Sequence, residues 1–322
     1  MLRSVVTVHA MSADLQHRLT PSTVALLIIP PLMWAGNAVV GRMMQGVVPP
    51  ITLNFLRWLL ALAILLPTAG WVLRPGSELW PHWRRFAVLG LLGVGLYNAL
   101  QYMALKTSTP INVTLVAAAT PIWMLLLGRL FFGVAISRKA ATGAAFSLAG
   151  VATVLSRGNI EQLLQVKLVA GDAWMLAATL VWATYSWLLA RPKPGAEPAA
   201  IKADWAAFLV AQMAIGLIWS GGMTAGEWLW LSSEGHAASQ ITWGWPLAAA
   251  LVYVAIGPSL LAYRCWGAGV GRVGPTIAGF FSNLTPLFAA VLSATLLGEM
   301  PKAYHALGFL LIVSGIVVSS RR

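Results

Sequence analysis

The chain alternates long apolar runs with short polar connectors. Ten runs are close to the roughly 20 residues that an α-helix needs to cross a hydrocarbon core of about 30 Å. Turn-forming and charged residues fill the connectors, as in the segment Arg191-Pro192-Lys193-Pro194-Gly195. The pattern therefore predicts an all-α integral membrane protein. Its ten transmembrane helices are expected at residues 23–44, 51–73, 85–105, 111–133, 139–156, 169–190, 205–226, 245–266, 274–297 and 303–320.

The second half of the chain resembles the first at a constant shift of 165 positions. Thr120-Pro121 recurs as Thr285-Pro286, and the pair Gly143 and Gly150 recurs as Gly308 and Gly315. Five helices per copy is an odd number, so the second copy must enter the membrane from the opposite face. This predicts two inverted repeats around a central cavity, as found in many transporters. The expected organisation is a cytoplasmic N-terminal segment at 1–22, a first repeat at 23–156, a linker at 157–168 and a second repeat at 169–320.

Composition supports the membrane and narrows the possible functions. Hydrophobic residues make up 59% of the chain and charged residues 9%, whereas a soluble domain carries about a quarter charged residues. The net charge of +12 comes from Lys and Arg at the ends of apolar runs. This placement predicts cytoplasmic termini by the positive-inside rule and argues against a nucleic-acid partner. One Cys permits no intramolecular disulfide, and five scattered His show no metal-ligand spacing, so neither metal nor cofactor is expected.

Two motifs carry a resemblance to a known family. Trp34-Ala35-Gly36-Asn37 is similar to the opening motif of the EamA branch of the drug/metabolite transporter superfamily. Leu297-Gly298-Glu299 and the two later glycines are similar to the motif that closes its second repeat. The resemblance covers roughly residues 23–320. It implies a secondary transporter of the bacterial inner membrane that exports small metabolites, most often amino acids, by alternating access. Because one chain contains both repeats, a monomer is expected.

Polar and aromatic side chains within the apolar runs are the candidate substrate-binding residues, because they are costly in lipid unless they face a cavity or a partner. Trp34 and Asn37 share one helical face, as do Trp182 and Tyr185 in the equivalent helix. Rings would bind the apolar part of a solute and amides the polar groups of a zwitterion. Alternatively, these residues join helices or form an interfacial belt. The full set is Trp34, Asn37, Tyr97, Asn98, Gln101, Tyr102, Trp182, Tyr185, Tyr263 and Asn283.

Two prolines are candidate hinges, and one arginine is a candidate for binding a substrate carboxylate. Pro121 and Pro286 fall in the middle of equivalent predicted helices and should kink them. Such kinks are either the hinges of a gate or fixed features of packing. Arg57 lies about two turns inside its helix. Its long side chain is expected to extend to the outer interface, the alternative being that it holds a substrate carboxylate.

No acidic residue lies in the middle of a predicted helix. Proton-coupled carriers commonly use a carboxylate at mid-membrane depth, so downhill transport is expected unless Glu299 or His305 carries a proton. Val134 replaces the acid at the position equivalent to Glu299.

An integral-membrane enzyme acting on a lipid-linked substrate is the alternative function, but it needs convergent His or carboxylate groups, and here they are dispersed. A dinucleotide-binding fingerprint is matched by the letters Gly269-Val270-Gly271-Arg272-Val273-Gly274. No predicted strand precedes them, so they are interpreted as a tight connector between helices and not as a nucleotide site.

Overall fold

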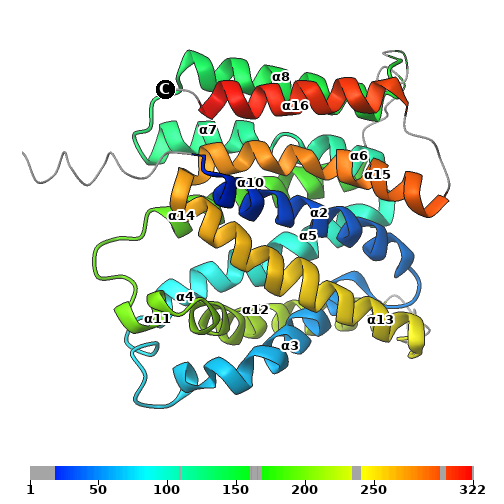
Figure 1. Ribbon diagram of the computed structural model, residues 1–322. Helices are drawn as coiled ribbons and strands as arrows, with labels where there is room; N and C mark the ends of the chain where they lie inside the picture. The colour runs from blue at the N-terminus through cyan, green and yellow to red at the C-terminus, as the bar shows by residue number, and fades with distance from the viewer. Residues whose placement is uncertain are drawn as a thin grey trace, which may run out of the picture.

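The computed structural model describes residues 19–320 apart from gaps at 109, 160, 162–164, 166–168, 234–240 and 298–301. These described residues form helices and connectors with no strand, and Figure 1 shows the helices packed side by side in one bundle. Glu299 and much of the predicted linker 157–168 lie outside them. Seven described segments are long and apolar enough to cross a membrane. The protein is therefore a multi-pass membrane protein. The segments are Pro21–Met43, Pro50–Leu73, Trp83–Thr107, Ala170–Ala190, Trp205–Ser233, Trp245–Ala289 and Ala303–Ser320.

The first half of the chain contains α2 to α8 and two short turns. Their bounds are α2 (Pro21–Met43), α3 (Pro50–Ala69), η1 (Gly70–Leu73), α4 (Trp83–Gly90), η2 (Leu91–Leu96), α5 (Tyr97–Thr107), α6 (Pro110–Ala117), α7 (Thr120–Phe131) and α8 (Arg138–Leu155). The π-helical turn η2 joins α4 to α5, so these three elements form one apolar segment.

The second half contains α10 to α16. Their bounds are α10 (Ala170–Ala190), α11 (Ala199–Ala203), α12 (Trp205–Ser233), α13 (Trp245–Val254), η3 (Ala255–Leu261), α14 (Ala262–Phe281), η4 (Ser282–Leu284), α15 (Thr285–Leu297) and α16 (Ala303–Ser320). The predicted connector at 267–273 is helical within α14. The backbone leaves helical geometry only at Gly274, where φ is 79°. Pro275 follows, and a residue before proline is disfavoured in the α conformation.

The two candidate hinge prolines start helices and do not kink the middle of continuous ones. Pro121 lies in the first turn of α7, after a turn at residues 118–119 that separates α7 from α6. Pro286 is the second residue of α15 and follows the 3-10 turn η4. Proline suits the first helical turn because its missing N–H has no partner there in any case. The expectation of mid-helix kinks is therefore wrong, and both prolines lie where a span is interrupted.

Helices α8 and α16 pack together through glycine faces, and they lie side by side at one edge of the bundle (Figure 1). A Cβ added at Gly143 would lie 2.7 Å from the carbonyl oxygen of Gly315. One added at Gly150 would lie 2.7 Å from the carbonyl oxygen of Gly308. The backbones are thus in direct contact, as at small-residue interfaces between membrane helices.

Glu227 of α12 caps the N-terminus of α3, a helix whose preceding residue Pro49 provides no side-chain cap. Its carboxylate accepts hydrogen bonds from the backbone N–H groups of Ile51 (3.0 Å) and Thr52 (2.8 Å) and from the Thr52 hydroxyl (2.8 Å). A helix N-terminus has unsatisfied N–H groups and a partial positive charge, both of which favour a carboxylate. This contact ties α3 to α12.

Glu227→Gln should destabilise the protein. The substitution keeps the side-chain volume but removes the charge and one acceptor, which costs about 1–3 kcal/mol at a buried group. Thermal unfolding in detergent measures the effect as a lowered Tm. The control is Glu78→Gln, which neutralises an exposed acid on the connector after η1. Equal Tm values for the two variants would contradict a stabilising role of the cap.

Candidate functional site

An aromatic cluster fills the middle of the bundle around Trp182 of α10, whose side chain is 2% exposed. Its rings come from α2, α5, α10 and α14, so residues far apart in the sequence meet here. The sequence identified all of them as candidates except Trp266, which follows Tyr263 by one helical turn. This one-turn spacing from Tyr263 is the sequence signal that could have identified Trp266. The ring of Trp182 lies 4.8–5.4 Å from those of Trp34, Tyr97, Tyr185, Tyr263 and Trp266.

A polar cluster around Arg57 of α3 lies against the aromatic cluster. The guanidinium donates four hydrogen bonds of 2.8–3.1 Å, and their acceptors are Ser259, Asn37, Asn98 and Tyr102. Asn37 also donates to Gln101 (3.0 Å) and accepts from Tyr102 (2.8 Å). The ring of Trp58 joins the clusters, because it lies 5.3 Å from the Arg57 guanidinium and 4.9 Å from the ring of Tyr263.

The expectation that Arg57 extends to the outer interface is wrong. Its side chain is 0% exposed, and its partners come from α2, α5 and η3. Acceptors on three neighbouring elements satisfy the guanidinium inside the bundle, so the side chain has no need to reach water. The alternative raised from the sequence, a role in binding a carboxylate, is compatible with this position.

A small cavity is bounded by residues of both clusters. Its volume is about 30 Å³, and its lining includes Trp34, Tyr97, Gln101, Trp182 and Asn283. That volume holds about one water molecule, whereas pockets for small molecules measure about 300–1,000 Å³. The described conformation is therefore closed around this part of the site. Pro286 also lines the cavity, whereas Pro121 does not.

A larger pocket of about 410 Å³ reaches the aromatic cluster from the side of the connector between α10 and α11. Tyr185 and Tyr263 form its inner wall, and Glu197 and Lys202 lie on its lining. The Tyr185 hydroxyl donates to Gln212 (3.0 Å), so this wall is fixed by a contact between α10 and α12. A solute that approached along this pocket would meet the two tyrosines before Trp182.

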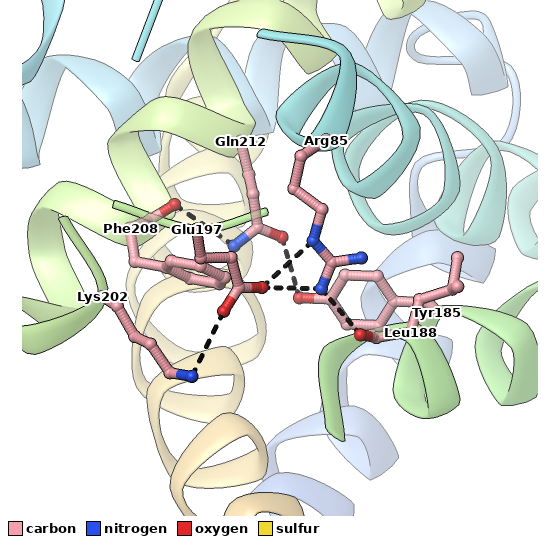
Figure 2. Close-up of polar contacts among 7 residues, drawn as sticks. All are labelled: Arg85, Tyr185, Leu188, Glu197, Lys202, Phe208 and Gln212. Carbon is pink, nitrogen blue, oxygen red and sulfur yellow. Dashed lines mark hydrogen bonds and ion pairs between the residues drawn. The ribbon is translucent and has the colours of Figure 1, made fainter. Parts of the chain in front are cut away.

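Figure 2 shows an ion-paired network that includes Glu197 and Lys202, two residues of this pocket's lining. Arg85 of α4 lies 2.6 Å from the carboxylate of Glu197 and donates to the carbonyl oxygen of Leu188 at the end of α10 (2.6 Å). Lys202 lies 3.6 Å from the same carboxylate. The network joins α4, α10 and the following connector. Sequence reasoning missed it, although Glu197 is the one acid within the basic stretch 191–202.

Metal binding has no candidate site in the described part of the chain, because no group of His, Cys, Asp and Glu side chains there could hold an ion. Asn283, the remaining candidate from the sequence, donates to Ser147 (2.8 Å) and joins η4 to α8. The structure thus brings nine of the ten predicted binding residues into two adjoining clusters, with Asn283 on the far wall of the small cavity.

Comparisons with known proteins agree with this architecture. The sequence profile of the EamA-like transporter family matches residues 21–156 and 169–321. An uncharacterised transporter of Archaeoglobus fulgidus is 28% identical, covering 92% of this chain and 96% of its own. A probable amino-acid metabolite efflux pump of Salmonella typhimurium is 26% identical (92% and 93% covered), and the aromatic amino acid exporter YddG of Ancylobacter novellus is 24% identical (90% and 93%). A solved crystal structure superposes with a TM-score of 0.65 at 22% identity, covering 93% of this chain and 96% of its own, and shares the fold.

Proposed function

Because the chain belongs to the EamA-like transporter family, we propose that it exports amino acids, including aromatic or other apolar ones, across the bacterial inner membrane by alternating access. The observation that carries this proposal is the pairing of a buried aromatic cluster with a buried polar cluster in the middle of an apolar bundle. Rings suit an apolar side chain, and amides and a guanidinium suit the polar groups of an amino acid. Relatives named as amino-acid exporters support the same substrate class. Family membership favours transport over the membrane enzyme considered from the sequence.

We also propose that ten spans form two inverted repeats, 23–156 and 169–320, with both termini in the cytoplasm. The segment Trp245–Ala289 has 45 residues and would extend about 68 Å as a straight helix, more than twice the hydrocarbon core. The break at Gly274 supports its division into two spans. The glycine contacts support the symmetry, because Gly143 meets Gly315 and Gly150 meets Gly308. Such crosswise pairing of equivalent positions is expected across a two-fold axis.

The two pockets suggest how access alternates. The small cavity beside Trp182 is closed, whereas the 410 Å³ pocket reaches Tyr185 from the side that the positive-inside rule assigns to the cytoplasm. In this proposal the Arg85–Glu197 ion pair holds α4 to the connector after α10 while this pocket is open. The interrupted spans at Pro121 and Pro286 are the hinges. A single chain contains both repeats, so the working unit is a monomer.

Counterflow in proteoliposomes tests the proposal. Liposomes loaded with one unlabelled amino acid should take up the same labelled amino acid transiently and saturably, while protein-free liposomes should not. The rate should be the same with and without a pH gradient, since no acid is expected at mid-membrane depth. Absence of exchange for all twenty amino acids, with protein that elutes as a single folded species, would contradict the assigned substrate class.

A further inference from the structure

Arg57 carries a positive charge in the middle of the bundle without an acidic partner among the described residues. Its four hydrogen bonds all go to neutral groups. The buried carboxylates of the described chain are engaged elsewhere. Asp172 interacts with Ser108 and the backbone of Val169, Glu197 pairs with Arg85, and Glu227 caps α3. A buried charge with no counter-charge is unfavourable and commonly marks a functional site in membrane proteins.

Arg57 and its neighbours have several unsatisfied polar atoms, most of them donors; the exception is the acceptor Oδ1 of Asn54, one turn earlier in α3. Within the described structure, Nη2 of Arg57, Nδ2 of Asn98 and Nε1 of Trp58 are buried and have no hydrogen-bond partner. The ring of Tyr263 contacts both Trp58 and Trp182. Within the described structure, Nε1 of Trp182 also has no hydrogen-bond partner. The neighbouring acceptor oxygens of Asn37 and Asn98 are already used by Nη1 of Arg57. Spare donors together with a positive charge are complementary to a group that only accepts, namely an anion.

We propose that Arg57 binds the carboxylate of the transported solute through its unpartnered Nη2. This inference rests on the proposed function and deepens it, because it restricts the substrates to compounds that carry a carboxylate. The planar guanidinium matches a carboxylate, and charged hydrogen bonds are stronger than those to the neutral acceptors that now surround it. A carboxylate can therefore displace one of these acceptors from Arg57.

The position of the small cavity is consistent with this assignment. Gln101 lines the cavity and accepts a hydrogen bond from Asn37, which in turn accepts one from Arg57. Two hydrogen bonds thus connect the cavity wall to the guanidinium, one between the amides of Gln101 and Asn37 and one from Arg57 to Asn37. On the far wall, Asn283 has an unpartnered Oδ1 within the described structure.

The test compares amino acids with their carboxamides, which keep the side chain and the amine but lack the carboxylate. The panel is the set of amino acids used in counterflow, each with its matched carboxamide as competitor. In the wild-type protein the free acid should compete at least about tenfold better than the amide, as loss of a charged hydrogen bond predicts. The acid should also raise the Tm of the purified protein, and the amide should not.

Asn98→Asp is the decisive variant, because it places an internal carboxylate where Oδ1 now lies 2.9 Å from Nη1 of Arg57. The protein should fold with unchanged or higher Tm and should lose the preference for acids over amides. Arg57→Gln should lose the same preference, but it removes a cross-link between helices, so Asn98→Asp stays informative if that variant is unstable. Arg42→Gln is the control, since Arg42 lies on the exposed side of α2 and its loss should leave the preference intact.

The possible results separate this inference from the proposed function. Exchange of acids and amides at equal rates in the wild-type protein would overturn the carboxylate site but leave amino-acid export in place. A retained acid preference in folded Asn98→Asp would also overturn it. Exchange of neither class would overturn both proposals together.

Discussion

Replacing Trp182 by alanine should reduce the initial rate of amino-acid counterflow at least about tenfold. Trp182 contacts five other rings, so its removal takes away the surface that would bind an apolar side chain. The substitution also leaves a cavity, and truncating a buried Trp to Ala typically costs about 3–5 kcal/mol. Loss of transport and loss of stability must therefore be measured separately, by proteoliposome flux and by thermal unfolding in detergent.

Two companion variants make this prediction specific to the site. Trp174→Ala removes a tryptophan from the same helix α10, but that side chain is 45% exposed and faces away from the cluster, so its flux should remain near that of the wild-type protein. Trp182→Phe keeps a ring and should restore part of the flux and most of the stability. Equal flux for Trp182→Ala and Trp174→Ala would mean that the aromatic cluster does not bind the solute.

The second large effect is expected at the contact between α8 and α16. Gly150→Ala should lower the Tm markedly, because the new Cβ would lie 2.7 Å from the carbonyl oxygen of Gly308 and 2.8 Å from Ile312. A backbone carbonyl cannot move aside like the end of a flexible side chain, so the helices must separate. Overpacking of this kind costs about 1–3 kcal/mol, and Gly150→Leu should prevent recovery of folded protein.

The matched control for this prediction is Gly222→Ala in α12. A Cβ added there meets no described atom within 4 Å, and alanine is the better helix former by about 1 kcal/mol. Its Tm should be equal to or higher than that of the wild-type protein. A Gly150→Ala protein as stable as Gly222→Ala would show that α8 and α16 do not depend on backbone contact.

The sequence predicted the ends of most described helices to within a few residues, because long apolar runs alternate with short polar connectors. It placed the break between two runs at 267–273, whereas the helix continues to Gly274. The backbone conformation at Gly274 sets the boundary. Helix 111–133 was predicted as one piece and is divided before Thr120, since periodicity alone does not distinguish a proline that starts a helix from one that bends it.

The candidate site was predictable to the extent that side-chain type reveals it. Aromatic and amide residues in lipid-spanning runs were identified from their cost in lipid, and most of them meet in the two clusters. The environment of Arg57 was not predictable, because it depends on how far α3 is rotated toward α2 and α5. The Arg85–Glu197 pair was missed because one partner lies in a connector, where no periodicity indicates which residues meet.

The glycine contact between α8 and α16 also bears on how the protein is made. About 150 residues separate the end of α8 from the start of α16, which corresponds to roughly 7–30 s at the usual speed of the ribosome. During this interval the glycine face of α8 has been synthesised and its partner has not. Lipid or the insertion machinery must cover that face until α16 emerges. The contact between α8 and α16 therefore forms late, and a nascent chain truncated before α16 leaves the glycine face of α8 without its partner.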